Sequence, residues 1–390
     1  MKLLSNIPAW PLLFSLKRNQ GLPLLFLLLV SMPLADSFLS IARPKRLFEN
    51  RRLSAKPRFQ WGDPAGYLKK YEAYFNDNFG FRNTLLVHHN TIMVRNLKTS
   101  PLARIVVGKN GWFFLDREDR EPGAIDYFRC LRPFSLPELE AWKTGLRQRH
   151  AWFSARGIVY LFIVVPNKDS IYPEFLPASI RRLGTQTRLE QLLSYLKKEP
   201  SIPIIDFRKE LLLEKSKSRL FPKTDSHWSP MGAYLAYVKI IAALSRHFPG
   251  LRPYPQHELY RVEKNYPGDL VKMLSLDRNA FLEPMIRLRM KPDHVRYASA
   301  SRGKYGPGID ETVDRTPDAP WPPLLMIHDS FQRRLRPFLS RHFRKVIYIS
   351  DRKLPIYKEL IDANQIKIVI DQRVERALMF QVLDNSAIAD

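Results

Sequence analysis

The sequence is poor in cysteine and glycine, and it has neither an internal repeat nor a low-complexity tract. Its 390 residues include one cysteine, Cys130, which excludes a framework of disulfides within the chain. Without a partner, Cys130 is expected to pack as a small buried hydrophobe rather than to act as a nucleophile. Glycines number only 16, whereas the 31 prolines often lie between periodic segments, where they stop helices. The 45% of hydrophobic residues suffice for a substantial core.

Acidic residues are also scarce relative to basic ones. The chain has 63 Lys and Arg against 38 Asp and Glu, a formal net charge of +25. Such a surface attracts polyanions, which include nucleic acids, anionic lipids and acidic glycans. The basic residues are scattered in short clusters, and the sequence has no zinc-finger spacing, RNA-recognition signature or basic-region zipper. We therefore expect no nucleic-acid partner, and the charge indicates a membrane surface or an acidic polymer.

The longest apolar stretch runs over residues 21–41. Its core, Leu22 to Ala35, is uncharged, and about 20 residues suffice to cross a bilayer once. We favour a single-pass anchor with residues 1–20 in the cytoplasm. The alternatives are a cleaved signal peptide, with Ala35 at the cut site, and a buried soluble helix. In the first two cases the rest of the chain lies outside the cytoplasm, periplasmic and next to the inner membrane.

Hydrophobic periodicity divides the remainder. Residues 42–100 read as an amphipathic helical segment that is interrupted around Asn76–Gly80. Residues 103–116 read as a strand, a tight turn at 109–111 and a second strand. Residues 101–390 form the predicted main domain. Within it, residues 249–322 are rich in proline and polar residues and hold few regular signals, so they read as an insert that could cover a substrate.

From residue 135 onward helices and strands alternate. We predict strands at 158–166, 202–207, 323–331, 345–350 and 367–372, several of them continuous apolar runs typical of strands buried on both faces. Helices are predicted at 135–156 and 187–199, and from Ser229 and Pro230, which fit the N-cap and first helical positions. This alternation predicts a mostly parallel, doubly wound α/β sheet with helices on both faces.

Two short motifs follow predicted strands, where active sites of parallel sheets lie. Ser330 ends the strand "LLMIHDS" and precedes a helix, the position at which a hydrolase exposes a nucleophilic serine. "KTDSHWSP" places Asp225 two residues before His227 in a loop. A serine needs a base, and a histidine base needs a carboxylate that orients it, so these three residues could form a catalytic triad. Alternatively, Asp225 and Asp329 are turn or cap residues and His227 is an ordinary loop histidine.

Other residue types in these loops have two interpretations each. Asn167 and Lys168 follow a strand and could contact an oxyanion or a substrate, or could form a turn and face solvent. Aromatic residues could stack on sugar rings, although core packing is their default. The aromatic candidates are Tyr172, Trp228 and Trp112, and the arginines that could meet an acidic polymer are Arg333 and Arg334. A metal site built on Asp225, His227, His328 and Asp329 matches no common ligand spacing, so we expect no metal and no cofactor.

"TDSHWSPMGA" and "MIHDSF" resemble the paired motifs of the alginate O-acetyltransferase group, the AlgX/AlgJ type of the SGNH-hydrolase superfamily. Further stretches resemble the family from about residue 47 to the C-terminus. They are "ENRRLSAKPRF", "YFNDNFGFRNTL", "IVVGKNGWFFL", "VVPNKDSIYPEFLP" and "YPGDLVKML". The resemblance implies a flavodoxin-like, permuted domain in which Asp and His precede the serine, as they do here.

The resemblance also implies roles for individual residues. Ser330 would be the nucleophile, His227 the general base and Asp225 its orienting partner, while His328 stands where the family has a glycine. The implied activity is acetyl transfer to hydroxyls of an exported polysaccharide, with a membrane-bound O-acyltransferase in the inner membrane as acetyl donor. Two alternatives remain: a carbohydrate acetylesterase with the same triad, and a non-catalytic scaffold that binds polyanions.

Overall fold

The computed structural model describes residues 21–39, 53–59, 61–116, 123–290, 294–297, 301–302, 310–350, 358–379, 383 and 385. The chain divides into two compact units, residues 1–89 and 90–390, and each is described by itself. The first holds α1 (Gly21–Leu39) and α2 (Pro64–Asn78), and α3 (Arg82–Arg95) begins in it. The end of α2 and the start of α3 confirm the predicted interruption around Asn76–Gly80.

The predicted membrane anchor is not shown by the structure. Helix α1 occupies most of that segment. Over the residues that the structure describes, no helix has both the length and the apolar character that a membrane crossing requires. The predicted cytoplasmic residues 1–20 and the beginning of the membrane-proximal segment lie outside the described residues.

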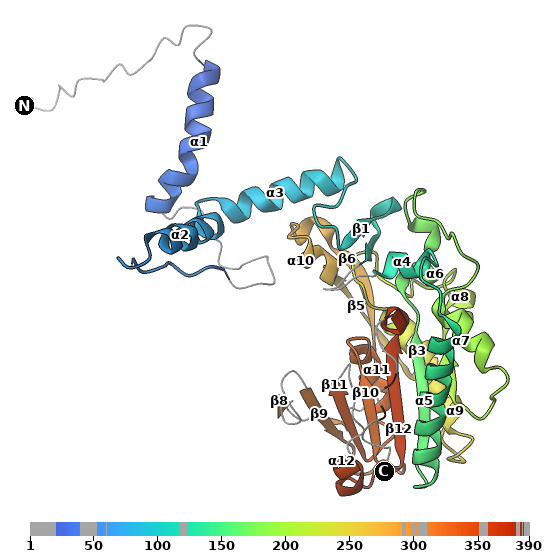
Figure 1. Ribbon diagram of the computed structural model, residues 1–390. Coiled ribbons are helices and arrows are strands. Elements are labelled where there is room, and N and C mark those ends of the chain that lie inside the picture. Colours follow the sequence, from blue (N-terminus) through green and yellow to red (C-terminus); the bar gives the residue numbers. More distant parts are fainter. Residues whose placement is uncertain are drawn as a thin grey trace, which may run out of the picture. The chain divides into compact units, whose positions relative to one another are not determined.

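The second unit is built on a sheet in which all five predicted strands are present. They are β3 (Val159–Val165), β4 (Ile204–Asp206), β10 (Leu324–His328), β11 (Lys345–Ser350) and β12 (Ile368–Val374). Their order is β4-β3-β12-β10-β11, and all of these neighbours pair in parallel (Figure 1). The predicted doubly wound core is therefore confirmed. Strand β10, which precedes Ser330, lies between β12 and β11 near the middle of the sheet.

Helices cover both faces of this sheet. Successive side chains of a strand point to opposite faces, so alternate residues of β10 contact different sets of helices. On β10, Leu324 and Met326 pack in the cluster that holds the buried residues of α8 (Arg208–Glu214), α9 (Pro230–Leu244) and α11 (Gln332–Leu339). Leu325 and Ile327 pack in the opposite cluster, with α5 (Leu136–Ser154), α7 (Arg188–Leu196) and α12 (Lys358–Ala363). Helix α9 begins as predicted, with Ser229 accepting a hydrogen bond from the Gly232 N–H and Pro230 in the first turn.

The region 249–322 is more regular than predicted. It contributes a hairpin of β5 (Tyr260–Tyr266) and β6 (Glu283–Arg289), with α10 (Asp269–Met273) between the two strands. It also supplies β7 (Arg296–Tyr297), β8 (Ser301–Arg302) and β9 (Asp310–Arg315), and β9 pairs antiparallel with β11. The sheet is thus mixed and eight-stranded over the described residues. These strands were missed because charged residues interrupt them and β5 is largely exposed, so no buried apolar run marks them.

The remaining elements frame the sheet at the ends of its strands. Strands β1 (Ile105–Val107) and β2 (Phe113–Leu115) form the predicted hairpin, with its turn at Lys109–Gly111. Short helices α4 (Ala124–Phe128) and α6 (Lys168–Ile171) precede and follow α5 and β3. Cys130, just after α4, is buried as predicted, and its thiol donates to the Phe128 carbonyl oxygen.

Candidate active site

Ser330 lies in the turn that joins β10 to α11, and it is exposed. The preceding residue fixes this turn. The Asp329 carboxylate accepts hydrogen bonds from the Phe331 N–H at 2.9 Å, from Gln372 Nε2 at 2.7 Å and from the Val374 N–H at 2.6 Å. These contacts tie the serine turn to the neighbouring strand β12. His328, at the position where the resemblance predicts a glycine, is the last residue of β10, and its extended backbone suits any residue type.

The loop 225–228 brings a histidine to this serine. His227 Nε2 lies 2.8 Å from Ser330 Oγ, and His227 Nδ1 lies 2.9 Å from Asp225 Oδ1. The same Asp225 oxygen accepts the backbone N–H of His227 at 2.9 Å, so two bonds fix the imidazole to its carboxylate. The three residues singled out from sequence therefore form one hydrogen-bonded chain, in which His227 and Ser330 are 103 positions apart in sequence. This arrangement can activate a serine hydroxyl for attack on an acyl carbon.

Buried polar groups hold the loop that carries Asp225. Lys168 Nζ donates to three main-chain oxygens, those of Phe113, Lys223 and Asp225, at 2.7, 2.7 and 3.1 Å. An ammonium group has three N–H donors, so these three acceptors match it. Lys168 is buried, so it stabilises the loop through these bonds and does not contact a substrate.

The region 249–322 holds the same loop from the other side. The Glu283 carboxylate of β6 accepts the N–H groups of Lys223 and Thr224, both at 2.8 Å, and the Thr224 hydroxyl at 2.5 Å. Gly268 lies so close that a Cβ placed on it would be 2.0 Å from the Thr224 oxygen. Only glycine allows this approach, which brings the first residue of α10, Asp269, beside His227.

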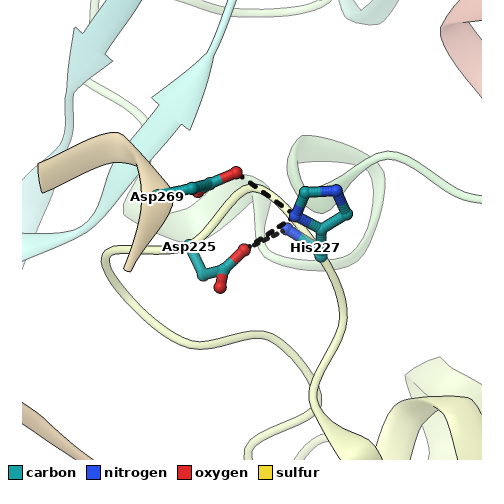
Figure 2. A group of neighbouring side chains, drawn as sticks. All are labelled: Asp225, His227 and Asp269. Carbon is teal, nitrogen blue, oxygen red and sulfur yellow. Dashed lines mark hydrogen bonds and ion pairs between the residues drawn. The ribbon is translucent and has the colours of Figure 1, made fainter. Parts of the chain in front are cut away.

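Asp269 is a site residue that the sequence analysis did not identify. Its Oδ2 lies 3.2 Å from His227 Nδ1, and its carboxylate also accepts the N–H and the hydroxyl of Ser226. Figure 2 shows the carboxylates of Asp225 and Asp269 both directed at the Nδ1 side of the ring. The available signal was the segment "YPGDLVKML", which resembles the family but suggested no role for its aspartate.

The charges around His227 shift its proton affinity. Burial by itself lowers the pKa of His227, but hydrogen bonds and charge from Asp225 and Asp269 outweigh burial and raise the pKa to about 9. Burial by itself would raise the pKa of Asp225, yet His227 and Arg334 hold it well below its usual range. Arg334 Nη2 donates to Asp225 Oδ2 at 3.1 Å. Asp225 therefore stays ionised and His227 is a strong base for a histidine.

A pocket of about 720 Å³ opens at Ser330 and His227. Its walls come from α11 and from the region 249–322, so this region borders the site. The lining is basic and aromatic, with Asp225 and Asp269 at its reactive end. The arginines are Arg287, Arg289, Arg333, Arg334 and Arg341, and the aromatic residues are Tyr260, Tyr266, Tyr297 and Phe338. Arg333 is exposed and lines the pocket, which is compatible with both interpretations given above.

The three aromatic candidates for sugar stacking are buried, in keeping with core packing, which the sequence analysis gave as their default. Trp228 is fully buried, and its Nε1 donates to the Phe331 main-chain oxygen at 3.1 Å, so it supports the serine turn from below. Tyr172 is buried, and its hydroxyl accepts the Leu220 N–H at 3.0 Å. Trp112 is buried against Phe175, with ring centroids 4.4 Å apart. These three residues are core residues, whose large rings contribute buried apolar area.

Asn167 and the alternative metal set are also placed by the structure. Asn167 is buried, its N–H donates to Glu375 at 2.9 Å, and no described group bonds its Nδ2. The structure does not bring the set of Asp225, His227, His328 and Asp329 together, since the Asp329 carboxylate is bonded to its own turn and to β12. Asp225, His227 and Asp269 offer atoms within 4.8 Å of one another, a grouping that their hydrogen bonds to the imidazole explain.

Comparisons with known proteins agree with this architecture. Residues 105–352 match the model of the SGNH hydrolase-like domain of the acetyltransferase AlgX. The chain is 27% identical over 179 residues to the probable alginate O-acetylase AlgJ of Pseudomonas aeruginosa, covering 44% of this chain and 41% of that protein. It is 28% identical over 176 residues to the probable alginate O-acetylase AlgJ of Pseudomonas fluorescens, covering 44% and 42%. The matched part thus spans less than half the length of these curated relatives.

Among solved structures, PatB1 of Bacillus cereus aligns with a TM-score of 0.52 at 16% identity, covering 71% of this chain and 99% of that one. At this identity the likeness concerns the fold. The family match covers most of the second unit, including the loop 225–228 and Ser330. The chain therefore belongs to the family of AlgX-type acetyltransferase domains with the SGNH hydrolase-like fold.

Proposed function

We propose that this chain is an O-acetyltransferase that moves acetyl groups onto hydroxyls of an exported polysaccharide through an acetyl-Ser330 intermediate. The observation that carries the proposal is the bond chain from Ser330 Oγ through His227 to Asp225, with spacings of 2.8 and 2.9 Å. It lies at the mouth of an open pocket in a chain of the AlgX family. The acetylase names of the curated relatives support acetyl as the transferred group.

The first half-reaction loads the serine. Ser330 Oγ attacks the carbonyl carbon of an acetyl donor while His227 Nε2 takes the hydroxyl proton. The resulting oxyanion is stabilised by hydrogen-bond donors, for which the backbone N–H of Ser330 is the natural candidate. The bond to the donor's leaving group then breaks, and that group leaves with the proton held by His227. Asp225 keeps the imidazole oriented and stabilises its charged form.

The second half-reaction unloads the serine. A sugar hydroxyl enters, gives its proton to His227 Nε2, and bonds to the acetyl carbon as the bond to Ser330 Oγ breaks. The proton returns to Ser330, which restores the free enzyme. The five arginines of the pocket support an acceptor that carries negative charge, such as an acidic polysaccharide. Tyr260 and Tyr297 offer rings for sugar packing in place of the buried aromatics.

The acetyl donor and the cellular location are part of the same proposal. A membrane-bound O-acyltransferase would supply acetyl groups at the inner membrane, and the apolar segment 21–41 would hold this chain beside it, with the catalytic unit outside the cytoplasm. Anchoring favours transfer over hydrolysis, because it keeps the enzyme close to a donor at the membrane. An acetylesterase with the same triad is the second candidate, since water and a sugar hydroxyl differ only as acceptors.

Acetyl-ester turnover tests the serine chemistry directly. We expect the purified full chain to release acetate from a chromogenic acetyl ester and to show an acetyl adduct by intact mass. Ser330→Ala should abolish the adduct and lower turnover by about 10⁴-fold or more, as loss of a triad member does elsewhere. Ser216→Ala, at an exposed serine, is the matched control and should behave as the parent.

Adding acceptors then separates the candidate functions. Acetyl appearing on an acidic oligosaccharide, at the expense of free acetate, supports the transferase. Acetate release that no glycan diverts supports the esterase. A folded parent with neither adduct nor turnover would contradict both enzymes, and the basic surface would then point to a polyanion-binding scaffold.

A further inference from the structure

The Nδ1 side of His227 faces one more carboxylate than a triad requires. Asp225 Oδ1 lies 2.9 Å from Nδ1 and Asp269 Oδ2 lies 3.2 Å from it. An imidazole carries a single hydrogen on this nitrogen, and one carboxylate is enough to orient it. The second carboxylate therefore calls for a role of its own.

The position of Asp269 is fixed by several contacts rather than by one flexible rotamer. Its Oδ1 accepts the Ser226 N–H at 2.7 Å, and its Oδ2 accepts the Ser226 hydroxyl at 2.5 Å. Gly268, directly before it, donates its N–H to the Thr224 hydroxyl at 3.0 Å. The Leu270 N–H also donates to the Thr224 oxygen, so several bonds join the loop that carries His227 to the turn that carries Asp269 and direct the carboxylate at Nδ1 (Figure 2).

The two carboxylates differ in their surroundings. Asp225 is almost completely buried, and its other oxygen accepts a bond from Arg334 at 3.1 Å. Burial and the nearby charge of Asp225 raise the pKa of Tyr266, which lines the same pocket. Asp269 keeps 32% of its side chain exposed, at the rim of the pocket. Asp225 therefore shares its charge with a cation, whereas the bonds to Asp269 come from Ser226 and from the imidazole.

We propose that Asp269 is a positioning residue for His227: together with Asp225 it accepts the Nδ1 hydrogen and keeps Nε2 directed at Ser330 in both protonation states. The inference rests on the proposed function, in which His227 is the base that serves Ser330. Asp269 acts through the imidazole and need not touch the substrate.

Charged and titratable groups reach His227 from several elements. Asp225 is in its own loop, Asp269 begins α10, Tyr266 ends β5 and Arg334 lies on α11. Lys168 of α6 lies behind the Asp225 main chain, and Glu283 of β6 binds residues 223 and 224. Of these groups, Asp225 and Asp269 bond the ring itself.

Loss of Asp269 has a specific consequence for proton affinity. An opposite charge at this distance raises the pKa of a base by about 1 to 3 units, so Asp269→Asn should lower the pKa of His227 by about one unit or more. The base must be neutral to take the serine proton, so the acidic limb of the profile of kcat/KM against pH should move to lower pH. A purely structural residue would lower the rate without moving this limb.

Two readouts on the full chain test the proposal. The first is the pH profile of kcat/KM with the chromogenic acetyl ester, for the parent and Asp269→Asn, with Asp277→Asn as an exposed control just after α10. The second is the pKa of His227 from NMR titration, with its signal assigned by its loss in His227→Gln. We expect both to shift downward in Asp269→Asn only. An unshifted His227 pKa in a folded variant would overturn the proposal.

The NMR readout also keeps the two proposals apart, because it needs no turnover. Suppose the parent has no activity, but the His227 pKa is lower in Asp269→Asn than in the parent. This outcome would refute the acetyl transfer and support the contact between Asp269 and His227. If Asp269→Asn does not fold, Asp269→Ser keeps an acceptor for the Ser226 N–H without the charge. As a further check, Asp225→Asn should retain more activity than the double variant of Asp225 and Asp269. Equal activities of these two variants would contradict a role for Asp269.

Discussion

Lys168 shows how burial turns a residue with plausible chemistry into a support for the site. Its position after a parallel strand suggests contact with substrate, but its Nζ faces inward and bonds three main-chain oxygens, one of them of Asp225. Burial lowers its pKa to about 7 against the pull of nearby acids. Trp228 is likewise buried, and its Nε1 donates to the main-chain oxygen of Phe331, next to Ser330. The residues that do line the pocket are Ser330, just after β10, and His227, in the loop before α9.

His227 should also leave a signature in stability. Its folded pKa is raised from the ordinary 6.5 to about 9, because the effect of two carboxylates exceeds that of burial. Its protonated form therefore stabilises the fold fully below about pH 6.5, and this contribution is lost as the pH rises through about 9. We expect the difference in unfolding free energy between parent and His227→Gln to shrink over that window in urea titrations. His247→Gln, at an exposed histidine, should show no such change. A difference that is constant with pH would contradict the raised pKa.

The hairpin β5–β6 with α10 is the element that completes the site. It borders the pocket, supplies Asp269 and fixes the loop 223–227 through Glu283. An element with so many contacts to the catalytic loop acts as part of the active-site scaffold rather than as a loose cover. This explains why a region without apolar runs is nonetheless regular: hydrogen bonds to the loop and antiparallel pairing hold it.

Glu283→Gln tests this dependence. The amide of the new side chain carries an NH₂ group where the carboxylate accepts the Lys223 N–H. Two hydrogen-bond donors then face each other, and the bond to Lys223 is lost. We expect a loss of about 1 to 3 kcal/mol in unfolding free energy and a lower kcat, measured by chemical unfolding and ester turnover. Glu263→Gln, exposed on β5, is the matched control. Equal behaviour of the two variants would show that the hairpin is not needed to hold the loop.

The charge of the whole molecule matters most where the pocket concentrates it. The net charge of +25 is spread over the chain, but five arginines line a pocket that includes Ser330 and His227. Such a field attracts an acidic polymer over a distance and then fixes it by direct pairing, and both effects weaken as salt screens them. The net charge by itself indicates only that polyanions are attracted, whereas the pocket shows where one could act.

Salt dependence should therefore distinguish the acceptors. Between about 0.05 and 0.5 M NaCl we expect kcat/KM for an acidic oligosaccharide to fall severalfold, and that for a neutral acetyl ester to stay nearly constant. Replacing Arg287 and Arg289 by Gln should reduce this salt dependence, whereas Arg246→Gln, exposed away from the pocket, should not. If neutral and acidic acceptors respond equally to salt, the arginines do not select for charge.

Sequence alone was sufficient for the parts of this protein that local pattern encodes. Buried apolar runs predicted the five parallel strands, cap residues predicted where α9 begins, and the Asp225, His227 and Ser330 motifs predicted residues that the fold then brings to within 2.9 Å. Tertiary structure decided the rest, because neither the direction in which a side chain points nor a contact between distant segments is encoded by local sequence. It turned Lys168, Tyr172 and Trp228 inward, joined β9 to the sheet through pairing with β11, and placed Asp269 on His227 through a glycine that lets two backbones touch.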